Sequence, residues 1–438
     1  MQKNKNIKFA ALVASLLFCF FAKFPARADL MAGAAKIDMT PDVANSAIPL
    51  GGYAARRGAP ATGVHDPVFA RAICLTDGGA KFEIVSVDLC FVPANLKAEI
   101  VKRVAAAGVS GLDSAHLLLA ATHTHCGPDP LAMHTGNNFP TLKNWPRFDP
   151  NLLDYTADRI AAAVIAADRA QVPARAGFRK VNLSRRHLNR NRRGDRIVDS
   201  DITLLKITTA EGKPLAALFN FAAHPTLYDE KMMQISADWP GVATATVERE
   251  SGNNAVCLFL NGDEGDATTA GATGFTAEER AANYGETMGR AALDLLRRIK
   301  TSRRLTLEAW TAGVPLPPRS PNPLFLIAAG QLGASFGQAQ ALVTNLMPTE
   351  TALSFAKIGR LLLMGFPCEP TGEIGLAAKQ IARRAGYKTA AVVALTNDWL
   401  AYCVTPAQYR AGKYESSMSF YGPNFGSAML TALETGLH

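Results

Sequence analysis

Histidines and acidic residues that could bind a metal ion follow several apolar runs in this sequence. Of the eight histidines in the chain, three come directly after such runs: His123, His125 and His224. Residues two apart on an extended segment face the same side, so the imidazoles of His123 and His125 could both reach one site. Glu369 follows another apolar run, 361–368.

These residue types suit a catalytic zinc ion, which takes imidazole and carboxylate ligands, keeps one position open for water and sits in a dry cavity. Imidazole is also the commonest metal ligand among side chains. The spacing alone leaves ordinary roles open: His224 could be a hydrogen-bonded imidazole. Glu369 could be a carboxylate stabilised by the dipole of a helix that starts near Thr371.

The apolar runs have the length and composition of buried strands, and segments with a helical period lie between them. We expect strands at 82–92, 116–122, 215–222, 255–260, 360–366 and 389–395, and helices at 94–107, 152–170, 276–299 and 371–385. Thr276 and Glu279 have the spacing of a capping box. This alternation predicts an α/β fold, a mixed and largely parallel sheet flanked by helices in one large domain, with ligands at the carboxyl ends of the strands.

Three other segments allow two interpretations each. Five prolines in 314–323 indicate either a domain linker or a surface crossing within one domain. The Arg- and Asn-rich segment 179–196 is typical of a solvated hairpin, although one of its arginines could bind an anion or a carbonyl group. We expect a further helix at 324–346, which either packs into the core or lines an acyl-chain groove with Phe325, Leu326, Leu332 and Phe336.

The N-terminus has the pattern of a secretory signal. Lys3, Lys5 and Lys8 precede an uncharged run at 9–22, and Ala26-Arg27-Ala28 provides a cleavage site after residue 28. This run is shorter than the roughly 20 residues that span a bilayer, and no later stretch is long and apolar enough to do so. We therefore expect an exported chain, periplasmic or secreted, with residues 29–438 as the mature protein and no transmembrane segment in it.

Removal of residues 1–28 takes away five cationic residues and no acidic one, which lowers the formal net charge from +9 to +4. This small charge and the lack of an RNA- or DNA-binding motif exclude nucleic acid as an expected partner. Six cysteines remain in the mature chain without a C-x-x-C pair. We expect buried free thiols rather than a cysteine-based zinc site, although an oxidising compartment would permit disulfides.

A set of short motifs between about residues 35 and 423 resembles, in order, the neutral/alkaline non-lysosomal ceramidase family. In the N-terminal half these are IDMTP (37–41), GGYA (51–54), HDPVFARA (65–72), VDLC (87–90) and ATHTHCGP (121–128). In the C-terminal half they are SADWPG (236–241), GDAT (265–268), PCE (367–369), YCVTP (402–406) and YGP (421–423).

The resemblance implies a catalytic zinc ion that cleaves the amide bond of ceramide. Matched motif by motif, the zinc ligands are His123, His224, Glu369 and Tyr402. The same comparison implies His125 as a second histidine near the substrate, and we expect it to protonate the departing amine. We assign Asp238 and Asp266 to orienting ligands and loops, with a turn role as the alternative for Asp238.

The other catalytic residues implied by the resemblance are Tyr414, Thr268 and Arg185, with Arg186 and Arg190 as alternatives to Arg185. Thr268 stands where the family carries a serine, so the hydroxyl is kept and a crowding methyl group is added. We also expect no C-terminal immunoglobulin-like domain of the kind that full-length ceramidases have.

The predicted function is therefore zinc-dependent hydrolysis of ceramide or a related N-acyl lipid, with transient contact at a membrane surface. Two alternatives stay open. One is a zinc amidase or esterase that acts on a smaller substrate. The other is a non-catalytic exported binding protein on the same fold, which the retention of all four ligand types disfavours.

Overall fold

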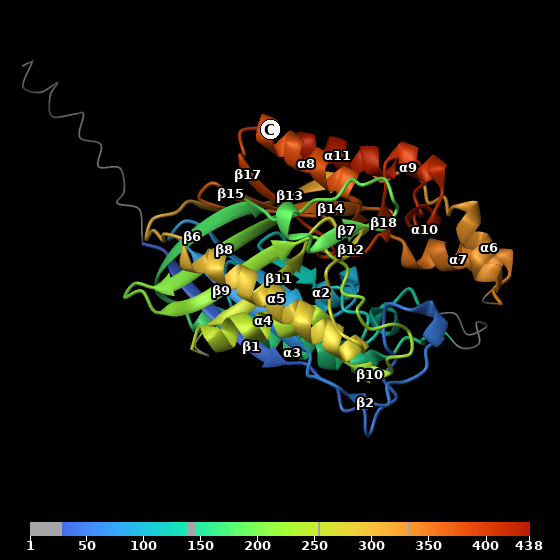
Figure 1. Ribbon diagram of the computed structural model, residues 1–438, viewed down its shortest axis with the longest axis horizontal. Helices are drawn as coiled ribbons and strands as arrows, with labels where there is room; N and C mark the ends of the chain where they lie inside the picture. Colours follow the sequence, from blue (N-terminus) through green and yellow to red (C-terminus); the bar gives the residue numbers. More distant parts are fainter. Residues whose placement is uncertain (1–28, 138–144, 253–254, 332) are drawn as a thin grey trace, which may run out of the picture.

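Two β-sheets face each other in the middle of the protein, and helices cover their outer faces (Figure 1). The computed structural model describes residues 29–137, 145–252, 255–331 and 333–438. The predicted signal segment 1–28 and Leu332 lie outside the described residues. The four layers, helix, sheet, sheet and helix, confirm the mixed α/β class with a sheet core flanked by helices.

The larger sheet has eight strands, in the order β11 (Val256–Asn261), β9 (Pro214–Phe221), β8 (Asp201–Thr209), β6 (Val172–Asn182), β1 (Met31–Asp38), β3 (Phe69–Thr76), β4 (Lys81–Val87) and β5 (Leu117–Ala121). The smaller sheet has the order β13 (Leu307–Val314), β14 (Thr351–Ile358), β15 (Leu361–Gly365) and β17 (Thr389–Val393). Three short ribbons lie outside these sheets: β2 (Gly63–Val64) with β10 (Gln234–Ile235), β7 (Asn189–Asn191) with β12 (Ala267–Thr269), and β16 (Glu369–Pro370) with β18 (Tyr402–Cys403).

The prediction that the sheet is largely parallel is wrong. In the described part of the larger sheet, only β11–β9 and β4–β5 are parallel, and in the smaller sheet only β15–β17 is. Each of these three pairs has a crossover helix between its strands, which a parallel pair requires. Strands joined by short turns, such as β3–β4 and β8–β9, pair antiparallel.

The six strands expected from the sequence are the members of those three parallel pairs. Both faces of such strands are buried, so they read as continuous apolar runs. In β4, Phe82 and Ile84 face the space between the sheets while Val85 and Val87 face the helices. The remaining strands, such as the half-exposed β6, lack a continuous apolar run and gave no comparable signal.

The crossover helices are α2 (Ala94–Ala106), α4 (Asp238–Glu250) and α8 (Gly372–Arg384). Helix α3 (Pro150–Arg169) packs with α2, α5 (Ala277–Arg297) packs with α4, and α11 (Phe425–Gly436) packs with α8. Thr276 and Glu279 form the predicted capping box at the start of α5. Two short helices, α9 (Pro406–Ala411) and α10 (Tyr414–Ser417), precede α11.

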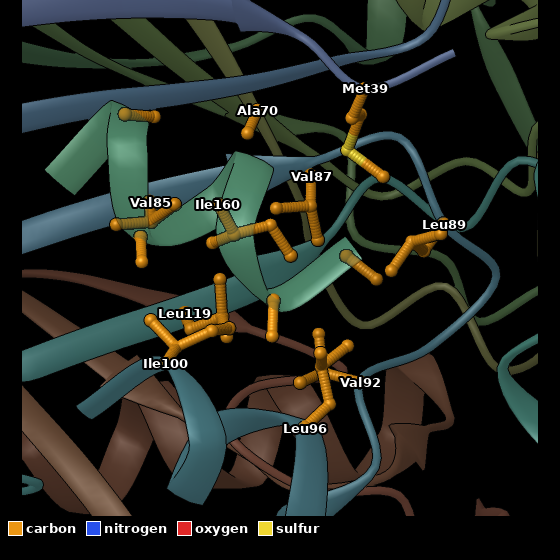
Figure 2. Close-up of a cluster of buried hydrophobic side chains, with 14 of the residues drawn as sticks. Met39, Ala70, Val85, Val87, Leu89, Val92, Leu96, Ile100, Leu119 and Ile160 are labelled. Carbon is orange, nitrogen blue, oxygen red and sulfur yellow. The ribbon is translucent and has the colours of Figure 1, made fainter. Parts of the chain in front are cut away.

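Burial of aliphatic side chains fixes the strands against these helices. Figure 2 shows Val85 and Val87 of β4 and Leu119 of β5 packed against Ile100 of α2 and Ile160 of α3. All five side chains are fully buried. Each contributes about 1.5–3 kcal/mol relative to an exposed position, so this cluster holds the strand ends in place.

The segment predicted as one helix at 324–346 forms two: α6 (Pro323–Gln331) and α7 (Phe336–Leu346). The Ser335 side chain and Gln338 form a capping box that begins α7, a start signal that lies within the predicted helix. The proline-rich segment 314–323 leads from β13 into α6, and β14 returns to pair with β13. It is thus a crossing within one sheet rather than a domain linker. Among the described residues, no helix is long and apolar enough to cross a membrane.

Candidate metal centre

Three of the parallel strands deliver the predicted zinc ligands to one place. His123 follows β5, His224 follows β9, and Glu369 follows β15 and begins the short strand β16. Strand β16 pairs with β18 in a register that sets Glu369 directly beside Tyr402. All four residues are buried.

The side chains of these residues converge within a few ångströms. The Nε2 atoms of His123 and His224 lie 2.9 Å apart, and Glu369 Oε2 lies 3.3 Å from the first and 3.6 Å from the second. The Tyr402 hydroxyl is 3.2 Å from His224 Nε2. The structure therefore brings together the four residues predicted as zinc ligands.

The hydrogen bonds of the two rings test whether a cation fits there. His123 Nδ1 donates to the Cys90 carbonyl at 2.6 Å, and His224 Nδ1 donates to the Glu264 carbonyl at 2.9 Å. In neutral rings both Nε2 atoms are then bare lone pairs. Two lone pairs that face each other beside Glu369 Oε2, which is buried without a hydrogen-bond partner, are stabilised by a positive charge between them, which either a proton on His123 or a metal ion supplies. The donor set fits zinc.

The surroundings favour positive charge at this point. Burial lowers the pKa of His224 well below its usual range, and Arg192 and His123 lower it further. Burial alone would raise the pKa of Glu369, but His123 holds it below its usual value, so the carboxylate stays ionised. Burial also opposes a charged His123, yet the Cys90 thiol and Glu369 together keep the pKa of His123 well above its usual value.

His125 stands beside the ligand cluster. Its Nε2 lies 3.4 Å from His123 Nε2, and its Nδ1 is buried without a hydrogen-bond partner. Burial lowers its pKa well below the usual range, with His123 adding to the effect. Gly52 makes room for the ring, since a Cβ at Gly52 would lie 2.3 Å from the His125 ring. The close approach therefore explains the glycine in the Gly51-Gly52-Tyr53 motif.

The expectation that Arg185 lies in the site needs correction. Arg185 is exposed on the 3₁₀ helix Ser184–Arg186, and the alternatives Arg186 and Arg190 are exposed as well. Arg192 occupies the site instead: it donates to the Tyr402 hydroxyl at 3.0 Å and to Glu415 at 2.8 Å. The chain beyond 182 is not a plain hairpin, because Asn189–Asn191 pair with β12 and turn Arg192 inward.

Two more predicted residues lie near the cluster. An isolated bridge joins His224 to Thr268, whose side chain is half-buried. The rings of Tyr402 and Tyr414 pack edge to face, 5.6 Å apart. Tyr414 is 55 % exposed, so it lies where the site opens to solvent.

We expected Asp238 and Asp266 to orient both the metal ligands and the loops. They orient loops, but they do not orient the ligands. Asp238 accepts hydrogen bonds from the backbone N–H groups of Leu227 and Trp239, as its turn interpretation predicts. Asp266 accepts from the Gly372 N–H at the start of α8. The ligand rings are oriented by backbone carbonyl groups instead. Carbonyls belong to every residue, so no sequence pattern marks them.

A cavity of about 340 Å³ opens beside the cluster, and His123, His125 and Glu369 form part of its wall. Helices α6 and α7 also line it, with Phe325, Ala339, Leu342, Val343 and Leu346. Of the four side chains predicted to line a groove, Phe325 does so, while Phe336 is 68 % exposed and Leu326 packs against the core.

Comparison with known proteins settles the family. Residues 30–290 match the family described as neutral/alkaline non-lysosomal ceramidase, N-terminal. The chain belongs to this family. The neutral ceramidase of Pseudomonas aeruginosa is 24 % identical over 94 % of this chain and 73 % of its own length, and that of Drosophila pseudoobscura is 23 % identical over 85 % and 69 %.

The fold of this ceramidase-family chain also has counterparts among solved structures. The crystal structure of the neutral ceramidase from Pseudomonas aeruginosa superposes with a TM-score of 0.77 at 20 % identity, covering 94 % of this chain and 75 % of that chain. A ceramidase complexed with C2 gives the same TM-score over 93 % and 74 %. The second was solved with a ligand.

Sequence reasoning missed two side chains of this site. Trp399 donates its indole N–H to Glu369 Oε1 at 2.9 Å and stacks on Phe91 with ring centroids 4.2 Å apart. Arg192 is the second. A signal for Trp399 was present, because it follows the predicted strand 389–395 at the same sheet edge as the ligands.

Proposed function

We propose that this protein is an exported zinc-dependent amidohydrolase that cleaves ceramide or a related N-acyl lipid. The proposal rests mainly on one observation: two bare imidazole nitrogens and a buried carboxylate oxygen converge within 4.8 Å of one another. Membership of the ceramidase family supports the amide bond as the target. The apolar wall of the cavity suits an acyl chain.

Zinc, when bound, supplies a Lewis acid and lowers the pKa of coordinated water to about 7. His123, His224, Glu369 and Tyr402 would hold it. The remaining chemistry falls to other side chains of the chain. His125, largely neutral and with a free nitrogen, would carry the proton to the departing amine.

Two further groups would stabilise negative charge on the carbonyl oxygen of the substrate. These are Arg192, which donates to the Tyr402 hydroxyl that would itself bind zinc, and Tyr414, which lines the cavity. Fixed donors of this kind typically contribute about 3 kcal/mol each to stabilisation of the transition state. For Thr268 we propose an influence on substrate preference rather than a direct part in catalysis, because its contact with His224 is made through the backbone.

A second candidate function is hydrolysis of a smaller amide or ester by the same centre. The cavity volume of about 340 Å³ favours it, since ligand sites range from about 300 to 1,000 Å³. A binding protein without turnover is the weaker alternative. We also propose export, with Asp29 as the first residue of the mature chain, and transient contact with a membrane surface during substrate uptake.

Metal analysis and turnover together test the proposal. Purified mature protein should contain about one zinc ion per chain and hydrolyse N-acyl substrates, and chelation should abolish turnover until zinc is restored. Chelation should also lower the melting temperature by on the order of 5 °C, because a ligand bound only to the folded state stabilises it. Protein without zinc, whose melting temperature chelators leave unchanged, would favour the binding protein instead.

A further inference from the structure

A second, basic cavity lies next to the metal centre and shares Tyr414 with the apolar cavity. It has a volume of about 240 Å³ and is lined by Arg192, Arg193, Lys413, Tyr414 and Glu415. Three of these five side chains are cationic and one is anionic. Tyr414 lines both this cavity and the apolar one, so a single substrate that passes Tyr414 would touch both.

The two arginines are held rigidly by the one carboxylate. Glu415 accepts from Arg192 Nε at 2.8 Å and from Arg193 Nη1 at 2.7 Å. Arg192 also donates from Nη2 to the Gly265 carbonyl at 2.7 Å. Its guanidinium lies 5.6 Å from the Tyr402 ring centre and 5.4 Å from that of Tyr414. This fixation leaves Nη1 of Arg192 without a hydrogen bond to any described residue.

Lys413 adds a cation that has no acidic partner among the described residues. Its side chain is exposed, and its ammonium group donates to the Arg193 carbonyl. An ammonium has three donors, so two remain for a ligand. Asp195 reaches Arg193 Nε at 3.6 Å, but it does not line the cavity. The lining therefore has a formal charge of +2 next to the reacting centre.

The size of the apolar cavity limits the other half of the substrate. A volume of about 340 Å³ lies near the lower end of the range of about 300–1,000 Å³ that ligand sites have. This cavity therefore suits one acyl chain better than two long chains together. The amine half of the substrate must then lie elsewhere.

We infer that Arg192, Arg193 and Lys413 form a subsite for an anionic group on the amine half of the substrate. This inference rests on the proposed amidase function and narrows its substrate class. The preferred substrates are then N-acyl amines that carry a carboxylate or a phosphate, such as an N-acyl amino acid or a phosphorylated ceramide. In the reaction the C–N bond breaks, the acyl carbon gains the oxygen of water, and the amine nitrogen gains a proton.

Pairs of matched substrates isolate the effect of the anionic group on turnover. N-lauroylglycine and N-lauroylethanolamine share the acyl chain and the amide and differ in one carboxylate. N-lauroylsphinganine and its 1-phosphate differ in one phosphate. We expect kcat/KM to be at least about tenfold higher for the anionic member of one pair, and that pair identifies the source of the anion. Raising the salt concentration should reduce this preference.

The variant Lys413→Gln should lower the preference for the anionic substrate roughly three- to tenfold, mainly through KM, and leave the neutral substrate within about twofold. Lys413→Glu should reverse the preference. Lys388→Gln removes an exposed lysine from another surface and should change neither.

The outcomes distinguish this inference from the function on which it rests. If neutral and anionic substrates are cleaved equally well, and Lys413→Gln affects both alike, the anion subsite is wrong while the amidase stands. If no N-acyl substrate is cleaved by zinc-loaded protein, the proposed function itself fails.

Discussion

At the scale of single residues, the metal centre depends on which ring nitrogen each histidine leaves free. Carbonyl groups take the Nδ1 protons of His123 and His224, so both Nε2 atoms point at the same position. Such partners fix the tautomer and orientation of a metal ligand. The carboxylate of Glu369 completes the set because Trp399 occupies its other oxygen.

Glu369→Gln tests this arrangement with little change in shape. The amide lacks the negative charge that balances a divalent ion, so zinc affinity should fall by at least about 100-fold and turnover by about 1,000-fold. Zinc content after dialysis against a weak chelator, measured by mass spectrometry, is the primary readout. Glu373→Gln, in the first turn of α8, should keep its zinc. A Glu369→Gln protein that retains full zinc would contradict the assignment.

Arg192 and Arg185 provide a direct contrast between structure and sequence. Arg192→Met should lower kcat for N-lauroylethanolamine roughly 10- to 100-fold, because the Tyr402 hydroxyl loses its fixed donor. Arg192→Lys should restore part of this loss. Arg185→Met should stay within about twofold of the wild type, since Arg185 is exposed. A larger loss of kcat in Arg185→Met than in Arg192→Met would contradict the assignment of Arg192 and support Arg185 as the arginine of the site.

At the scale of elements, three βαβ crossovers bring the predicted metal ligands together, and α6 and α7 line the cavity beside them. The crossovers place the ends of β5, β9 and β15 near one another. The two short helices lie at the right edge of Figure 1, beyond β18, and their side chains line the apolar cavity beside the metal centre.

Leu342→Trp in α7 should shorten the preferred acyl chain. The larger side chain fills part of the apolar cavity, so kcat/KM for a dodecanoyl amide should fall roughly tenfold while a butanoyl amide changes little. Ile327→Trp in α6 is the matched control, because Ile327 is 61 % exposed and does not line the cavity. Equal effects of both variants on chain-length preference would argue against the acyl-chain assignment.

The elements that the sequence predicted well are those buried on both faces. Strand β15 and its partner β17 read as apolar runs, and the residues that follow them reach the site. The antiparallel strands and the break between α6 and α7 were missed. Their sequences place polar or small residues between the apolar ones, so tertiary contacts rather than local pattern decide their conformation.

At the scale of the whole molecule, a buried acid lies far along β4 from the metal centre. Glu83 is fully buried, and neither of its carboxylate oxygens has a hydrogen-bond partner. Burial raises its pKa to about 8, Asp168 adds to this shift, and the Cys74 thiol and Lys81 oppose it. The folded protein therefore keeps this group protonated at neutral pH, whereas the unfolded chain does not.

This difference makes global stability depend on pH. Between about pH 4.5 and 8 the folded state binds more protons than the unfolded state, so the Glu83 contribution falls as pH rises. The variant Glu83→Gln removes this pH-dependent loss. Its gain in free energy of unfolding over the wild type should therefore be larger at pH 8 than at pH 5, by on the order of 3 kcal/mol. Urea unfolding at both pH values measures it. Glu434→Gln, an exposed acid, should show no such gain.

The sequence by itself determined the residue types of the metal centre and the strands that hold them. Buried strands read as apolar runs, and the His, Glu and Tyr residues that follow such runs were recognised as candidate metal ligands from their types. Only the tertiary structure decided which arginine reaches Tyr402, which carbonyls orient the imidazoles, and how the sheets pair. Those features depend on backbone groups and on turns between distant segments, which leave no residue-specific pattern in the chain.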